Sequence, residues 1–171
     1  MKRTTKIVAA VMAVLMLLSA AGCDFLAKEP VTYDDGVGLT IVMPEGMQPM
    51  NEAGMAMSYV DNNCLMTAVR EDFAEYAELG VDLENMSIEE YAALCVEANA
   101  GNGMSGEFVE DANGNLYNTY NATIDGDEFF YYCTVRKGTD AFWAITFACL
   151  ASEQAKYEGE FTNWNNSIVV D

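Results

Sequence analysis

The sequence predicts an α+β domain in which an antiparallel β-sheet is flanked by helices. Short runs of β-branched and aromatic residues, separated by glycine, proline and Asn-Gly or Asp-Gly turns, occupy most of residues 31–71 and 106–150. Amphipathic helical patterns begin at Ser87 and near Ser152, one after each region. The strand expected at 141–150 is apolar on both alternating faces, so helices should cover both sides of the sheet and give an α/β/α sandwich.

Two hairpins account for the first part of the domain. Their strands are expected at residues 31–35, 39–43, 55–60 and 64–71. The connections are Gly36-Val37-Gly38 in the first hairpin and Asp61-Asn62-Asn63 in the second. The acidic stretch at 72–86 has no decisive periodicity, and we expect it to be irregular.

The second part begins with a helix, followed by a run of strands and a closing helix. Ser87 and Glu90 form a capping box, and Gly101 and Gly103 end the first helix. Three or four strands of an antiparallel meander follow, at residues 106–110, 116–124, 128–137 and 141–150. One apolar stripe should hold the closing helix against the sheet: Tyr157, Phe161, Trp164 and Ile168.

Residues 1–22 have the order of an export signal, with basic residues, an apolar run at 7–18 and small residues before Cys23. This run is shorter than the ~20 residues that a membrane-spanning helix needs. The segment resembles the bacterial lipobox, although Ala20 stands where that motif usually has leucine. The resemblance implies cleavage before Cys23 and attachment of a diacylglyceryl group, with acyl chains such as palmitate, to its sulfur. Residues 23–30 would then be a lipid-anchored tether.

Residues 31–171 are expected to form a single domain, and the chain is strongly acidic. It carries 27 acidic and 8 basic residues, for a net charge of −19, and loss of residues 1–22, which hold three basic and no acidic residues, makes this −22. This balance argues against nucleic acid as a partner, because phosphate binding needs clustered Lys and Arg. Solubility and repulsion from an anionic membrane explain the acidity better than a cationic ligand does.

Four cysteines besides Cys23 lie in apolar segments: Cys64, Cys95, Cys133 and Cys149. Buried free thiols are the preferred interpretation, although export permits disulfides. In the predicted hairpin, Cys133 should face position 144 or 145, which leaves Cys149 about 13–17 Å away along the strand. A disulfide needs Cα atoms within about 7 Å. If a bridge exists, Cys95 with a strand cysteine is the expected pair.

The order of the elements resembles the PsbP/Mog1/DcrB-like sandwich. The resemblance is carried by the strand and turn from Gly38 to Met47 with Pro44-Glu45-Gly46, by the helix led by Ser87-Ile88-Glu89-Glu90-Tyr91, and by the strand run and closing helix. It covers most of residues 31–171. The resemblance implies a bacterial lipoprotein or an accessory subunit of a membrane complex, few of which are enzymes, and it carries over no site residues.

The residue types argue against several kinds of catalysis. The chain has no histidine, which excludes Ser-His-Asp and Cys-His nucleophiles and histidine-containing zinc sites. The core cysteines form no Cys-x-x-Cys pair, which argues against a cysteine zinc site. We therefore expect no catalytic residue, metal or cofactor, and Cys23 is the one predicted site residue. A cell-envelope hydrolase that uses acidic residues stays as an alternative, since 27 acids make some carboxylate pair inevitable.

Acidic turns, an aromatic run and scattered methionines are the remaining candidate binding features. The acidic turns include Asp34-Asp35, Asp111-Ala-Asn113-Gly114-Asn115 and Asp125-Gly126-Asp127-Glu128, whose oxygens would suit calcium in a calcium-stabilised accessory protein. None matches an EF-hand loop, so turn formation is the favoured interpretation. Phe129-Phe130-Tyr131-Tyr132 is expected to pack in the core. The methionines between 43 and 66 are expected either to pack adaptably in the core or to form a plastic interaction surface.

The sequence therefore predicts a membrane-anchored, extracytoplasmic lipoprotein that binds without catalysing a reaction. Its partners would be the membrane, through the lipid anchor, and an unidentified envelope protein or small ligand.

Overall fold

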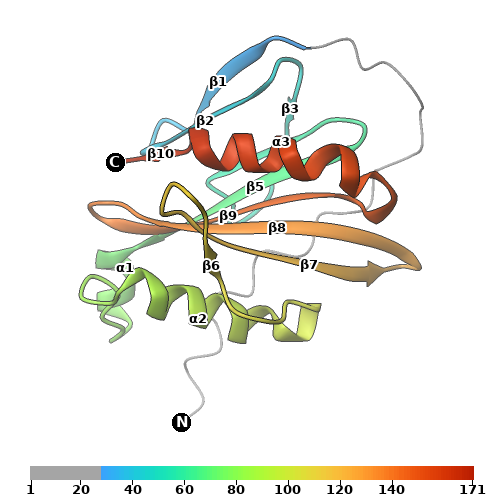
Figure 1. The fold of residues 1–171 in the computed structure, drawn as a ribbon. Helices are drawn as coiled ribbons and strands as arrows, with labels where there is room; N and C mark the ends of the chain where they lie inside the picture. The colour runs from blue at the N-terminus through green and yellow to red at the C-terminus, as the bar shows by residue number, and fades with distance from the viewer. Residues whose placement is uncertain (1–27) are drawn as a thin grey trace.

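A seven-stranded antiparallel sheet forms the centre of the computed structural model, which describes residues 28–171 (Figure 1). The predicted signal at 1–22 and Cys23 lie outside these residues. The order across the sheet is β3 (Gln48–Pro49), β4 (Met57–Val60), β5 (Cys64–Asp72), β9 (Ala141–Leu150), β8 (Asp127–Lys137), β7 (Leu116–Ile124) and β6 (Val109–Glu110). Every neighbouring pair is antiparallel, which confirms the predicted second hairpin and the meander.

A second, three-stranded sheet contains the predicted first hairpin. Its strands are β1 (Pro30–Asp34), β2 (Leu39–Pro44) and β10 (Val169–Val170), in the order β1-β2-β10. The sequence predicted the pairing of β1 with β2 correctly but indicated neither the separate sheet nor β10. Only two residue pairs join β10 to β2, and so short a strand has no periodicity to detect.

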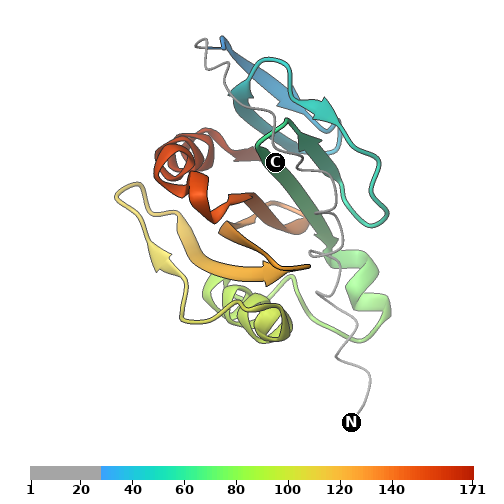
Figure 2. The same ribbon diagram turned by 90° about the vertical axis from the view of Figure 1, so that its right-hand side faces the viewer.

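Helices lie on both faces of the large sheet. α1 (Phe73–Glu78) and α2 (Ile88–Asn99) cover one face, while α3 (Gln154–Ser167) and the small sheet cover the other (Figures 1 and 2). Short 3-10 turns, η2 (Ala100–Asn102) and η3 (Ala151–Glu153), adjoin α2 and α3. This arrangement confirms the α/β/α sandwich. No helix among residues 28–171 combines the length and apolar character needed to cross a membrane.

α1 corrects the expectation that residues 72–86 are irregular. The Asp72 carboxylate accepts hydrogen bonds from the backbone N–H groups of Ala74 and Glu75, and thereby caps the helix. Asp72 is also the last residue of β5, so strand and helix follow each other without a loop. A six-residue helix shows too few turns for its pattern to be recognised.

The core is divided by the sheet into two layers. Phe130 and Tyr132 of β8 pack toward α3, whereas Phe129 and Tyr131 belong to a cluster on the α2 side. The same alternation explains why β9 is apolar on both faces. In the α3 layer, the Phe147 ring lies 5.4 Å from the Phe161 ring, as the predicted stripe requires. The aromatic run is therefore core, as expected.

The turn between β8 and β9 corrects the predicted register. Cys133 lies opposite Thr146, not position 144 or 145. The reason is that the two-residue turn lies at Thr139-Asp140 and not at Gly138-Thr139. Gly138 is opposite Ala141, and its N–H donates to the Ala141 carbonyl at 2.9 Å. Cys149 lies opposite Phe130, three positions from the Cys133 pair and hence on the other face, so the conclusion that these two cysteines cannot bridge still holds.

Candidate functional site

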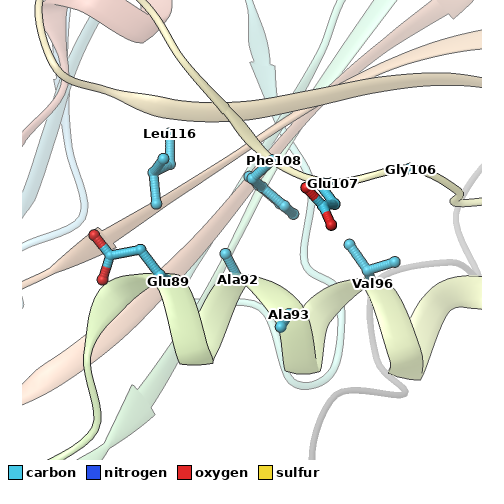
Figure 3. Close-up of a pocket in the computed structure, with 8 residues that line it drawn as sticks. All are labelled: Glu89, Ala92, Ala93, Val96, Gly106, Glu107, Phe108 and Leu116. Atoms are coloured by element: carbon cyan, nitrogen blue, oxygen red, sulfur yellow. The ribbon is translucent and has the colours of Figure 1, made fainter.

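A groove of about 440 Å³ lies between α2 and the chain segment that leads into β7 (Figure 3). Its lining is mainly apolar: Ala92, Ala93, Val96, Gly106, Phe108 and Leu116. Two carboxylates complete it, with Glu89 near Leu116 and Glu107 near Val96 (Figure 3). The volume is in the range of roughly 300–1,000 Å³ that is typical of ligand sites. This groove is the candidate binding site.

The α2 wall is held rigidly at its N-terminus. The Ser87 hydroxyl accepts from the Glu90 N–H at 3.1 Å, and the Glu90 carboxylate accepts from the Ser87 N–H at 2.8 Å, which confirms the predicted capping box. On the buried side, the Tyr91 ring stacks on Phe142 of β9, with centroids 4.1 Å apart. Ala92 and Ala93 are small, so the helix surface next to these anchors leaves space for a ligand.

The opposite wall, residues 105–108, is held by a buried side chain. The Asn118 amide donates to the carbonyls of Ser105 and Glu107, both at 3.1 Å. Gly103, two residues before this wall, has a positive φ of 95°, and a Cβ there would come within 3.1 Å of the Ala122 Cβ. Phe108 lines the groove on one side and a cavity of about 10 Å³ beneath α2 on the other. The wall is therefore positioned by the hydrogen bonds from Asn118 and by the close packing of Gly103 against Ala122.

The charge of the groove is negative. Glu89 and Glu107 are exposed, and neither forms an ion pair with any residue from 28 to 171. An apolar lining with a carboxylate at each end can hold an apolar group that carries a positive charge.

Glu71 of β5 is a buried acid that the sequence analysis did not single out. It is 2% exposed, and the Tyr76 hydroxyl donates to its Oε1 at 3.0 Å. Burial raises the pKa of Glu71, while the hydroxyls of Tyr91 and Tyr76 act in the opposite direction. Through the Tyr76 hydroxyl, Glu71 ties β5 to α1, and it does not line the groove. An acidic residue near the end of an apolar strand was the signal that could have revealed it.

A second buried polar network joins β8, α3 and the turn at residues 111–115. The Arg136 guanidinium donates to the Asn165 side-chain oxygen at 2.8 Å and to its carbonyl at 3.1 Å. The Asn165 amide donates to Asp111 at 3.3 Å and to the Tyr132 hydroxyl at 3.2 Å. Burial lowers the pKa of Arg136. The sequence analysis missed this network because its members are far apart in the chain.

The acidic segments proposed as possible calcium ligands form turns. The Asp35 Oδ1 accepts from the N–H groups of Val37 and Leu39, and the Asp111 Oδ1 accepts from those of Asn113 and Asn115. Burial raises the pKa of the Asp111 carboxyl, whereas the hydrogen bonds from Asn115 and Asn113 lower it. The net effect is a lowered pKa. Within residues 28–171, no three His, Cys, Asp or Glu side chains gather into a group that could hold a metal ion.

The sulfur-containing side chains are mainly core residues. The four cysteines of the domain are free thiols and buried, as preferred from the sequence. Burial raises the pKa of all four thiols, to about 11 for Cys133 and about 12 for Cys149. Four methionines of the early segment are buried between the large sheet, α3 and the small sheet: Met43, Met47, Met57 and Met66.

Comparison with solved structures identifies the fold. PsbP (CyanoP) from Synechocystis sp. PCC 6803 matches with a TM-score of 0.53 and 11% identity, over 88% of this chain and 98% of that one. The Saccharomyces cerevisiae Ran-binding protein Mog1p matches with a TM-score of 0.56 and 12% identity, over 84% and 96%. The chain therefore has the α+β sandwich fold shared by PsbP and Mog1p.

More distant and sequence-based comparisons add no assignment. LpqN of Mycobacterium tuberculosis, described as involved in cell envelope biogenesis, matches with a TM-score of only 0.45 and 9% identity, over 83% of this chain and 89% of that one. No protein-family model matches the sequence, and no curated protein matches it.

Proposed function

We propose that this chain is a non-catalytic accessory protein of the cell envelope, anchored to the membrane through Cys23, which binds a partner protein in the groove beside α2. The observation that carries the proposal is the groove: an apolar lining with a carboxylate at each end. Anchoring is supported by the order of residues 1–22, which ends in small residues directly before a cysteine.

The occupant of the groove is a segment of the partner that combines apolar side chains with at least one lysine or arginine. The apolar part is matched by Ala92, Val96 and Phe108, and the charge is matched by Glu89 and Glu107. The net charge of −19 also favours encounter with a basic surface. The fold is compatible with such a role, because Mog1p is described as a Ran-binding protein.

The first experiment measures binding of short peptides to the purified chain. A peptide of leucine and lysine is compared with one in which glutamate replaces lysine. Glu107→Lys should weaken binding of the basic peptide about tenfold, equivalent to about 1.4 kcal/mol. Glu97→Lys is the matched control, because Glu97 is exposed on α2 outside the groove and its substitution changes the net charge equally. Equal weakening by both variants would contradict binding in the groove.

The second experiment uses membranes of cells that produce the full chain. A photo-reactive amino acid is placed at position 93, inside the groove, or at position 98, an exposed position of α2 that does not line it. We expect a cross-linked protein at position 93 that is lost when Glu107→Lys is added. Cross-links from position 98 alone, or a product that Glu107→Lys leaves unchanged, would contradict the proposal.

A further inference from the structure

Two buried cysteines lie directly opposite each other on neighbouring strands. Cys64 is the first residue of β5, and its partner in the antiparallel register of β5 and β9 is Cys149. Both side chains belong to the core layer between the sheet and α3, where Cys64 is 1% and Cys149 0% exposed. The two sulfurs therefore project from the same face of adjacent strands.

The backbone geometry of this pair is suited to a disulfide. The Cys64 N–H donates to the Asp61 side chain at 2.9 Å, and the Cys64 carbonyl accepts from the Asp61 N–H at 3.0 Å. Both groups are therefore used on the β4 side, so Cys64 and Cys149 form a non-hydrogen-bonded pair. In such pairs the Cα atoms are about 4.5 Å apart. Disulfides span Cα separations of about 4.4–6.8 Å.

The other end of the β5–β9 ladder supports the assignment of Cys64 and Cys149 to a non-hydrogen-bonded pair. The Phe73 N–H donates to the Asp140 carbonyl at 2.8 Å, which makes that opposed pair a hydrogen-bonded one. Hydrogen-bonded and non-hydrogen-bonded pairs alternate along antiparallel strands. Phe73 is an odd number of positions from Cys64, so the alternation again gives a non-hydrogen-bonded pair at Cys64 and Cys149.

We propose that Cys64 and Cys149, which are free thiols in this structure, are oxidised to a disulfide bond in the exported chain. The other two cysteines lie across the sheet, with Cys95 on α2 and Cys133 in the cluster on that side. This separation removes the pairing of Cys95 with Cys64 or Cys149. The proposal does not rest on the groove or on Cys23, and its test is independent of both.

Formation of the bond requires an external disulfide compound as oxidant. The thiolate of one cysteine attacks a sulfur of that compound, releases one thiol and leaves a mixed disulfide on the protein. The thiolate of the second cysteine then attacks the mixed disulfide and releases the second thiol. Two protein thiols thus give their two electrons and two protons to the oxidant. Both side chains are buried in the folded domain, where an external disulfide has no access to them, so we expect the reaction before these strand ends are buried during folding.

Trypsin distinguishes the possible pairings. Cleavage after Lys28, Arg70, Arg136, Lys137 and Lys156 leaves Cys64 in residues 29–70 and Cys149 in residues 138–156, while Cys95 and Cys133 stay together in 71–136. The reduced full chain is refolded in oxidised and reduced glutathione, treated with N-ethylmaleimide in urea, and digested without reduction.

The expected product joins peptide 29–70 to peptide 138–156 and separates into both on reduction. Chain extracted from the envelope of producing cells should give the same product. Recovery of both peptides as maleimide adducts, or linkage of either one to peptide 71–136, would overturn the proposal.

Thermal unfolding gives a second, independent measurement. Reduction should lower the Tm of the oxidised chain by about 10 °C, because the bond closes a long loop. In Cys64→Ala this dependence on reductant should disappear, whereas Cys95→Ala should keep it. A dependence that persists in Cys64→Ala would assign it to other cysteines and contradict the proposal. If Cys64→Ala fails to fold, the peptide map of the natural sequence decides alone.

Discussion

Replacing Asn165 with alanine should destabilise the domain more than replacing any other asparagine of α3. Asn165 is 0% exposed, and its side chain makes three hydrogen bonds, to Arg136, Asp111 and Tyr132. The bond from the guanidinium contributes about 1.5–3 kcal/mol, and each bond from the amide about 1 kcal/mol. The expected loss is therefore about 3–5 kcal/mol, in the range found when one partner of a buried charge is removed.

The assay is urea unfolding followed by the fluorescence of Trp143 and Trp164, both of which are buried. In thermal unfolding followed by the same fluorescence, the Tm should fall by about 10–15 °C for a domain of this size. Asn163→Ala is the matched control, because Asn163 is exposed on the same helix and alanine favours helix at exposed positions. Its effect should be within about 0.5 kcal/mol.

The comparison of the two variants can refute the reasoning directly. If Asn165→Ala differs from Asn163→Ala by less than about 1 kcal/mol, the Arg136 guanidinium must find other acceptors or water at little cost. The network would then be a consequence of the fold and would contribute little to its stability.

Two further predictions concern pH and anchoring. Burial raises the pKa of Glu71 in the folded state. Between the unfolded and folded pKa values, the folded state therefore holds a proton that the unfolded state has released. Glu71 thus contributes stability at low pH, and this contribution is lost as the pH rises through the raised pKa. Glu71→Gln should remove this part of the pH dependence in urea unfolding, and an unchanged slope would argue against a raised pKa. Cys23→Ser should release a folded domain from the membrane fraction, and a processed chain that stays membrane-bound would refute the lipid anchor.

Local patterns predicted most of the strands because their signals are contained in a few neighbouring residues. Strands β7 and β9 have the expected bounds, 116–124 and 141–150. α1 was missed because its cap, Asp72, still belongs to a strand and the helix has only six residues. The separate sheet of β1, β2 and β10 was not predictable, since a hairpin pattern does not specify which sheet the hairpin joins.

The candidate site was less accessible to sequence analysis because it depends on contacts between distant residues. Ala93 and Val96 have the pattern of an ordinary helix surface, and they form a groove only because residues 105–108 lie opposite them. That segment is positioned by Asn118, whose amide bonds to backbone carbonyls 11 and 13 residues away. The pairing of Cys64 with Cys149 likewise required the register of two strands separated by most of the domain.

The outer wall of the groove depends on side chains more than on the sheet. β6 is two residues long, and only two residue pairs join it to β7. The wall is held mainly at two points, by Asn118 at the carbonyls of residues 105 and 107 and by the contact between Asp111 and Asn165. A wall with so few backbone hydrogen bonds opens at lower cost than the central strands. A partner segment that covers Phe108 would therefore stabilise a weakly paired edge of the sheet, which links binding in the groove to order at β6.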